Sequence, residues 1–173
     1  IGLALTQHRH SHIFRRVGTS LDAMEERSRE IMTGHGSYNS TEKVWHLTDG
    51  RIVKFCHCEH EKDKEKWQGK AADFKGFDEL TQFTEKLYLY LSGWNRSAVP
   101  GQRSRRVATF NPPQDENGAW VLDRFGCWID KDHENPAKPG DLRWFVMVES
   151  VDTMVEGPGT FVIDGKSYTA QSR

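Results

Sequence analysis

Residues 72–94, ADFKGFDELTQFTEKLYLYLSGW, constrain the fold most, because a β-rich run passes directly into a helical one. From about residue 81 onward, apolar side chains recur at helical spacing, at Phe83, Leu87, Tyr90 and Leu91. A strand that feeds a helix in this way favours an α/β fold. We therefore predict a mainly parallel sheet with flanking helices.

The first part of the chain repeats this alternation. Residues 1–6 read as the end of a helix, and residues 12–17, HIFRRV, read as a short strand. Thr19 or Ser20 can cap a second helix, and Gly34 stands just past its end. The apolar positions of this predicted helix are Leu21, Met24, Ile31 and Met32.

Two β-rich runs flank an Asp-Gly pair in the next segment. Residues 43–47 and 51–58 alternate in polarity on either side of Asp49 and Gly50. An Asp-Gly turn between such runs predicts a β-hairpin.

Further β-rich runs follow in the second half. Residues 105–110, RRVATF, predict a strand that ends at Asn111 and the two prolines after it. A polar linker over residues 132–140 precedes two more β-rich runs. They predict a hairpin region at the end of the chain.

Charge and cysteine content limit the classes of function. The formal net charge is −1 and the pI about 6.8, so any contact with nucleic acid must come from a local basic patch. Three cysteines favour a reducing compartment, and no apolar run could cross a membrane. We expect a cytoplasmic protein. The chain opens without methionine and reads as the interior of a longer one.

The stretch from Arg51 to Gly69 holds two cysteines, Cys56 and Cys58, and two histidines, His57 and His60. In an extended strand Cys56, Cys58 and His60 could share a face and bind a metal ion. Structural zinc needs four ligands, and no second cysteine pair occurs. Buried thiols that act as small apolar groups are the alternative, which we favour.

Adjacent acids follow the strand at residues 72–77. Asp78 and Glu79 fit the Walker B position of an ATPase, where the first acid holds the Mg²⁺ shell and the second polarises the attacking water. The alternative is an Asp-Glu pair that opens a helix, where acids suit the positive end of the dipole. Asp73 and Lys75 also interrupt an otherwise apolar strand.

The strand at residues 105–110 ends in small polar side chains. Thr109 and Asn111 are candidates for a sensor of the γ-phosphate that relays hydrolysis to moving parts. The alternative is a strand that simply ends in an Asn-Pro turn.

Taken in order, these segments resemble the large terminase subunit of tailed bacteriophages, the ATPase that drives DNA into the capsid. The resemblance covers nearly the whole chain. Its most specific part is GFDELTQF followed downstream by NPP and GAWVLDRF. It is supported by HIFRR, YNSTEKVWHLTDGRIVKF, HEKDKEKWQG and YLSGWNRS.

The resemblance implies a P-loop NTPase-like fold and a role for several residues. Asp78 would be the Walker B acid that holds Mg²⁺ through water, and Glu79 the catalytic glutamate. Residues 109–111 would form the coupling motif. The Cys/His stretch would be scaffold. Residues 1–125 would be a partial ATPase domain, and residues 126–173 a linker and hairpin region that leads toward a nuclease domain.

The resemblance also implies cofactors and partners. These are ATP and Mg²⁺, double-stranded DNA, the small terminase subunit and the portal protein, with a homo-oligomeric ring during packaging and no membrane. The site of action would be the cytoplasm of the bacterial host.

Two parts of the family pattern lie outside these residues. No phosphate-binding loop G-x-x-x-x-G-K-[S/T] occurs, so we expect it upstream of Ile1, and we expect the nuclease carboxylates beyond Arg173. Residues 159–167, GTFVIDGKS, are a near miss, because five residues rather than four separate the glycines. We interpret them as a hairpin.

Basic residues offer contacts to phosphate or nucleic acid. The candidates are Arg16, Arg96, Arg105 and Arg106, although exposed basic loops are often only solvated. Two other functions stay open: another DNA translocase or helicase-like ATPase with a P-loop, and a non-catalytic zinc or nucleic-acid binding module.

Overall fold

A computed structural model describes residues 1–149 and 151–172. The chain forms two compact units, Ile1–Val121 and Leu122–Arg173. Among the described residues, no helix is long and apolar enough to cross a membrane. The roles assigned to the two parts from the sequence stay predictions.

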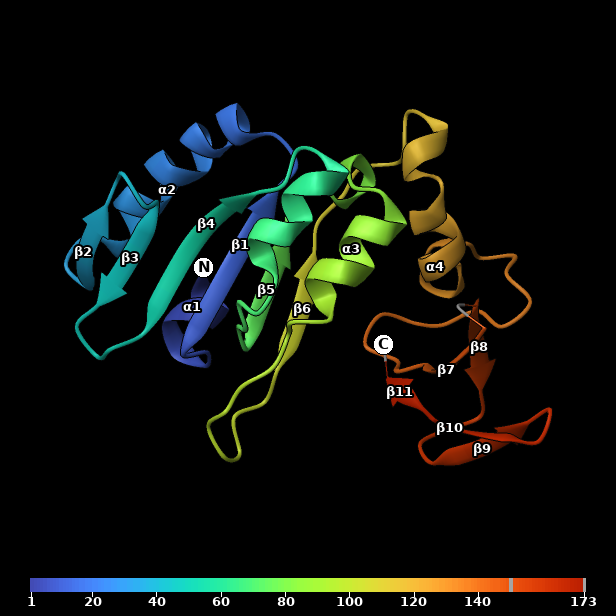
Figure 1. The fold of residues 1–173 in the computed structure, drawn as a ribbon. Coiled ribbons are helices and arrows are strands. Elements are labelled where there is room, and N and C mark those ends of the chain that lie inside the picture. The colour runs from blue at the N-terminus through green and yellow to red at the C-terminus, as the bar shows by residue number, and fades with distance from the viewer. Residues whose placement is uncertain (150, 173) are drawn as a thin grey trace. The chain divides into compact units, whose positions relative to one another are not determined.

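The first unit is built on a six-stranded sheet with the order β2-β3-β4-β1-β5-β6 (Figure 1). Strands β4, β1, β5 and β6 are parallel, and β2 and β3 form the antiparallel end. The bounds are β1 His10–Arg15, β2 Gly36–Asn39, β3 Val44–Leu47, β4 Ile52–His57, β5 Phe74–Phe77 and β6 Arg105–Ala108. The predicted α/β fold with a mainly parallel sheet is confirmed.

Helices cover both faces of this sheet (Figure 1). The α-helices (α) and 3-10 helices (η) of the first unit are α1 Gly2–Thr6, η1 Gly18–Leu21, α2 Asp22–Met32, η2 Glu61–Trp67, η3 Leu80–Gln82, α3 Glu85–Ser92 and η4 Glu116–Gly118. Ala4 and Met32 pack with Ile13 on one face. On the other face Trp67 and Phe77 pack on Phe14, at ring-centroid distances of 5.0 and 5.5 Å. The helices thus follow the two-sided burial of a parallel sheet.

Two details of the predicted second helix are wrong. The structure begins α2 at Asp22 after a 3-10 turn, so neither Thr19 nor Ser20 caps it, and the N-cap Leu21 makes no side-chain bond. Ile31 is 39% exposed, whereas Leu21 and Met32 are fully buried. The buried face of α2 is formed by Glu25, Ser28 and Met32. Ile31 lies about 100° round the helix from Met32, so it leaves that face.

The hairpin at Asp49 and Gly50 is confirmed. β3 and β4 pair antiparallel, and Gly50 has a φ of +83°, which glycine adopts without strain. The structure adds β2, which the sequence analysis missed. At Gly36 of this strand a Cβ would lie 2.2 Å from the carbonyl oxygen of His46, so the close approach of β2 to β3 requires glycine.

The second unit contains the predicted β-rich end of the chain. Helix α4, Trp120–Ile129, precedes it and runs through the boundary between the units. The strands are β7 Trp144–Val148, β8 Val151–Val155, β9 Thr160–Ile163, β10 Lys166–Thr169 and β11 Gln171–Ser172. Residues Asp164 and Gly165 turn the β9–β10 hairpin with positive φ. Residues 159–167 are therefore a hairpin, as predicted, and not a phosphate loop.

Candidate functional site

The candidate site lies where three neighbouring parallel strands end. Arg15 is the last residue of β1, Asp78 follows β5, and Thr109 follows β6. The register pairs Phe14 with Phe77 and Phe77 with Ala108. The next residue of each strand therefore stands at the same level, and the three side chains converge on the carboxyl edge of the sheet.

Arg15 contacts both acids. Its Nε donates to Oδ2 of Asp78 at 2.8 Å, and its Nη2 donates to Oε1 of Glu79 at 3.0 Å. Its Nη1 donates to the carbonyl oxygen of Ser20 at 2.8 Å. The side chains of Arg15, Asp78 and Glu79 are 21%, 31% and 35% exposed, so solvent reaches the site. One guanidinium thus balances two adjacent negative charges.

Thr109 fixes Asp78 from the other side. Its hydroxyl donates to Oδ1 of Asp78 at 2.6 Å, and the Asp78 amide donates to the carbonyl oxygen of Phe14 at 2.9 Å. Both oxygens of Asp78 are therefore held, one by β1 and one by the residue that follows β6. This contact links the predicted Walker B acid to the predicted coupling strand.

Glu79 has an unusual backbone. Its φ of 54° lies in the left-handed region, which costs a residue with a side chain about 1 kcal/mol or more. The amide of Leu80 donates to the carbonyl oxygen of Thr109 at 2.9 Å, and Gln82 donates to Oε2 of Glu79. The backbone turns sharply at Glu79, directly after β5. The contacts of Leu80 with Thr109 and of Gln82 with the Glu79 carboxylate hold this turn in place. Strained backbone of this kind concentrates at functional sites.

The oxygen atoms of Asp78, Glu79 and Thr109 fit Mg²⁺ better than they fit a metal ion whose ligands all come from the protein. In residues 1–149 and 151–172, no three or more His, Cys, Asp or Glu side chains group so as to hold a metal ion. Mg²⁺ usually takes one or two carboxylates and completes its shell with water and substrate phosphates. Asp78 and Glu79, with the Thr109 hydroxyl beside them, match that pattern.

No protein-family model matches the chain, and no curated protein matches it. Among solved structures, the chain is similar to the large terminase from a thermophilic bacteriophage. The two are 14% identical, with a TM-score of 0.49, over 69% of this chain and 30% of the other. The matched protein belongs to the family that the sequence resembles. Because the match spans under a third of that terminase, the activity and partners of a whole terminase are proposals here.

The second sensor candidate, Asn111, lies outside the cluster. It is exposed in the loop after β6. Within the described residues it makes no hydrogen bond to Asp78 or Glu79, whereas Thr109 does. Of the predicted sensor pair, the structure brings Thr109 alone to the acids.

The predicted phosphate-contacting arginines do not reach the acids. Arg16 donates to the carbonyl oxygen of Cys58 at 2.9 Å. Arg105 and Arg106 pair in register with Phe74 and Lys75, at the start of β5 and not at its end. The amide of Arg96 donates to Ala72, just before β5. Arg96, Arg105 and Arg106 therefore lie at the opposite, amino edge of the sheet.

Two residues of the site were not among the candidates selected from the sequence. Of the pair Arg15 and Arg16, sequence reasoning selected Arg16, but Arg15 is the one that binds the acids. Gln82, one turn after Glu79, was not considered. One signal could have identified Arg15. It directly follows the apolar pair Ile13 and Phe14 of its strand, just as Asp78 directly follows Phe77, and two parallel strands that end at the same level would bring these residues together.

The Cys/His stretch is built into the scaffold. Cys56 and Cys58 are buried, and their Sγ atoms lie within hydrogen-bonding reach of the carbonyl oxygens of Lys54 and His60, at 3.4 and 3.9 Å. Burial, with a smaller contribution from nearby Asp63, raises the pKa of the Cys58 thiol to about 11. Burial also raises the pKa of Cys56. Both thiols are protonated at neutral pH and poor metal ligands in that form.

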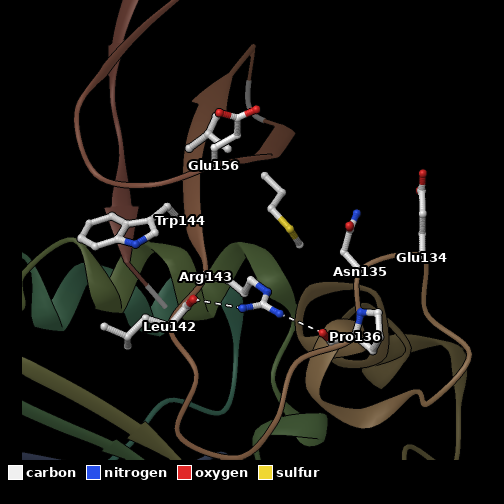
Figure 2. Close-up of a pocket in the computed structure, with 9 residues that line it drawn as sticks. Glu134, Asn135, Pro136, Leu142, Arg143, Trp144 and Glu156 are labelled. Atoms are coloured by element: carbon white, nitrogen blue, oxygen red, sulfur yellow. Dashed lines mark hydrogen bonds between the residues drawn. The ribbon is translucent and has the colours of Figure 1, made fainter.

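A separate cavity of about 330 Å³ lies in the second unit (Figure 2). Arg143 crosses it and donates to the carbonyl oxygens of Pro136 and Leu142, at 2.8 and 3.3 Å. Its lining is Glu134, Asn135, Pro136, Leu142, Arg143, Trp144, Met154, Val155 and Glu156. Arg143 therefore ties the polar linker to the start of β7, and the cavity holds none of the predicted site residues.

Proposed function

We propose that this chain is part of the ATPase domain of a phage or prophage large terminase, an ATP-driven motor that moves double-stranded DNA into a capsid. One observation supports the proposal above the others: Asp78, Glu79 and Thr109 converge at the carboxyl edge of a parallel sheet. Ligands of open α/β sheets bind outside this edge.

Each residue of the cluster has a role in the proposal. Asp78 holds the water shell of Mg²⁺, and Glu79 orients and polarises the water that attacks the γ-phosphate of ATP. When bound, Mg²⁺ neutralises negative charge on the phosphates. The phosphates themselves would be held by a loop that these residues do not include.

Thr109 is suited to couple the site to movement. Its hydroxyl holds Asp78 while its carbonyl oxygen accepts the amide of Leu80, next to Glu79. A change at either acid therefore alters contacts at the end of β6. We propose that this strand passes the change toward bound DNA, with the small terminase subunit, the portal protein and a ring of identical subunits as partners.

The test of the catalytic assignment is Glu79→Gln in a protein that also carries the phosphate loop. We expect ATP binding to persist and turnover to fall by about 100-fold to 10,000-fold, because an amide cannot accept the proton of the attacking water. Glu65→Gln, at an exposed position of η2, is the matched control and should turn over normally. Turnover retained by Glu79→Gln would remove Glu79 from the mechanism.

A packaging assay separates the terminase proposal from the helicase-like alternative. The terminase proposal expects ATP-dependent protection of duplex DNA inside empty phage heads. DNA-stimulated hydrolysis without such protection would instead identify a translocase of another kind.

A further inference from the structure

Positive charge concentrates at the amino edge of the sheet. Three segments meet there, residues 7–12, 67–72 and 93–106, and together they contain six lysines and arginines and no aspartate or glutamate. We call these cations the amino-edge surface: Arg9, Lys70, Arg96, Arg103, Arg105 and Arg106. Because the whole chain has a formal charge of −1, the remaining residues are net negative.

Backbone contacts hold the three segments together. The amide of Ala72 donates to the carbonyl oxygen of Trp94 at 3.2 Å, and the amide of Arg96 donates back to Ala72 at 2.9 Å. The side chain of Gln102 donates to the carbonyl oxygen of Gln7 at 3.0 Å. The long loop between α3 and β6, which projects beyond the sheet in Figure 1, is therefore anchored beside β1 and β5.

The cations of this surface lack a carboxylate partner among the described residues. Within the described residues none of the six forms an ion pair with a carboxylate, whereas Arg15, Lys43 and Lys66 each do. Asp73, which follows the second segment in the sequence, is 2% exposed and accepts the backbone amides of Arg9 and His10 at 2.9 and 2.6 Å. Its carboxylate therefore binds buried backbone amides and does not pair with the exposed cations.

Two of the cations lie over aromatic rings. The guanidinium of Arg96 lies 4.8 Å from the ring centroid of Trp94, and the ammonium of Lys70 lies 5.0 Å from that of Trp67. A stacked guanidinium keeps its N–H groups in the plane of the fork, where they can still bind an anion. Five of the six cations are arginines, whose forks match phosphate oxygens.

This surface is distinct from the candidate ATPase site. Arg105 stands level with Phe74 at the start of β5, and the acids follow Phe77 at its end. At about 3.3 Å per residue, roughly 10 Å of strand separates the two edges. An anion bound by Arg103 or Arg106 is therefore a different one from a nucleotide phosphate at Asp78.

We propose that the amino-edge surface binds the phosphate backbone of nucleic acid without reading its sequence. Arg103 and Arg106 are exposed, and polar side chains of the same loop, Asn95, Ser97 and Ser104, add donors of the kind that contact phosphates. The inference rests on the proposed function for the choice of duplex DNA as the ligand. Its test needs no ATP hydrolysis.

The test is the affinity of the protein for a short DNA duplex of arbitrary sequence, measured by fluorescence anisotropy without ATP over a range of salt concentrations. The double variant Arg103→Gln/Arg106→Gln should bind about tenfold more weakly or worse at low salt, and the slope of log K against log salt should shrink by roughly 1.8. A second duplex of different sequence should give the same result.

The matched control is Lys62→Gln/Lys86→Gln, which removes the same charge from exposed positions of η2 and α3. It should bind nearly as the unchanged protein does, and unfolding curves should show both double variants folded. Equal losses in the two variants, or no loss in either, would overturn the proposal.

Two further measurements separate the possible failures. Displacement by polyglutamate as effectively as by DNA of equal charge would identify an acidic protein as the partner and overturn the nucleic-acid proposal. Glu79→Gln should bind the duplex normally. If Glu79→Gln hydrolyses ATP normally while Arg103→Gln/Arg106→Gln still binds DNA more weakly, the ATPase assignment is wrong. The proposal that the amino-edge surface binds DNA is then still supported.

Discussion

Arg15 is the residue on which the geometry of both acids depends. It donates to Asp78 and Glu79 and is itself held by the carbonyl oxygen of Ser20. Two adjacent carboxylates repel one another, and the shared guanidinium offsets that repulsion. Hydrogen bonds to charged groups contribute about 1.5–3 kcal/mol each where solvent does not screen them, and less at partly exposed sites such as this one.

We predict that Arg15→Gln lowers the free energy of unfolding by about 1–2 kcal/mol, because glutamine cannot bridge both acids or balance their charge. Urea unfolding measures the change. Arg27→Gln is the control, because Arg27 pairs with Glu30 on the exposed face of α2, where both side chains are more than half exposed. A surface change of this kind should stay within about 0.5 kcal/mol. Equal effects would mean that Arg15 does not hold the site.

Strand β5 carries a lysine where a central parallel strand is normally apolar. Lys75 is fully buried, and its Nζ has no hydrogen-bond partner among the described residues and lies 5.5 Å from the ring centroid of Phe14. Its register neighbours on β1 and β6 are the basic residues His12 and Arg106. Burial lowers the pKa of Lys75 from 10.5 to about 8, although Cys56 opposes the shift.

This pKa predicts a pH dependence of stability. Between about pH 8 and 10.5, Lys75 is mostly protonated in the unfolded chain and mostly neutral in the folded chain. The free energy of unfolding therefore rises with pH in this range, and the penalty for burying the Lys75 charge is largest below pH 8. We expect Lys75→Met to raise the free energy of unfolding at pH 7 by up to about 3 kcal/mol and to show a smaller gain at pH 10. Urea unfolding at both values checks this.

Lys70→Met, at an exposed position just before β5, is the control for the general effect of removing a lysine. It should change stability little, and equally at both pH values. A Lys75→Met protein that is less stable than the unchanged one at pH 7 would contradict the prediction.

Exposed loops predict where the intact chain is cut early. The linker at residues 132–140 is polar and mostly exposed, and the loop at residues 93–106 contains no acidic residue. A glutamate-specific protease should therefore cut early after Glu134, as after other exposed loop glutamates such as Glu59 and Glu156, because exposed loops are cleaved more readily than helices and strands. Mass spectrometry of early digests should find residues 1–134 and 135–173.

Glu134→Gln should remove the cut after residue 134 without changing the others. Early cleavage after Glu26 or Glu30, both within α2, would contradict it by showing that the first unit opens as readily as the linker.

Most elements of the fold follow from local patterns. The β5 and α3 runs, the Asp49-Gly50 hairpin and the β9–β10 hairpin could be predicted because a turn or a helix depends on residues close in sequence. The missed strand β2 has a weak local pattern, and it exists because Gly36 admits the close approach of β3. The position of Asp78 and Glu79 directly after a strand was likewise readable from the chain.

The partners of these acids depended on pairing between distant strands. Arg15 and not Arg16 meets Asp78 because β1 and β5 align Phe14 with Phe77, and side chains alternate along a strand, so a shift of one residue would exchange the two arginines. The same parallel order sends Thr109 to the acids and Arg105 and Arg106 to the opposite edge. Local sequence set which residues end each strand, and long-range register decided which of them meet.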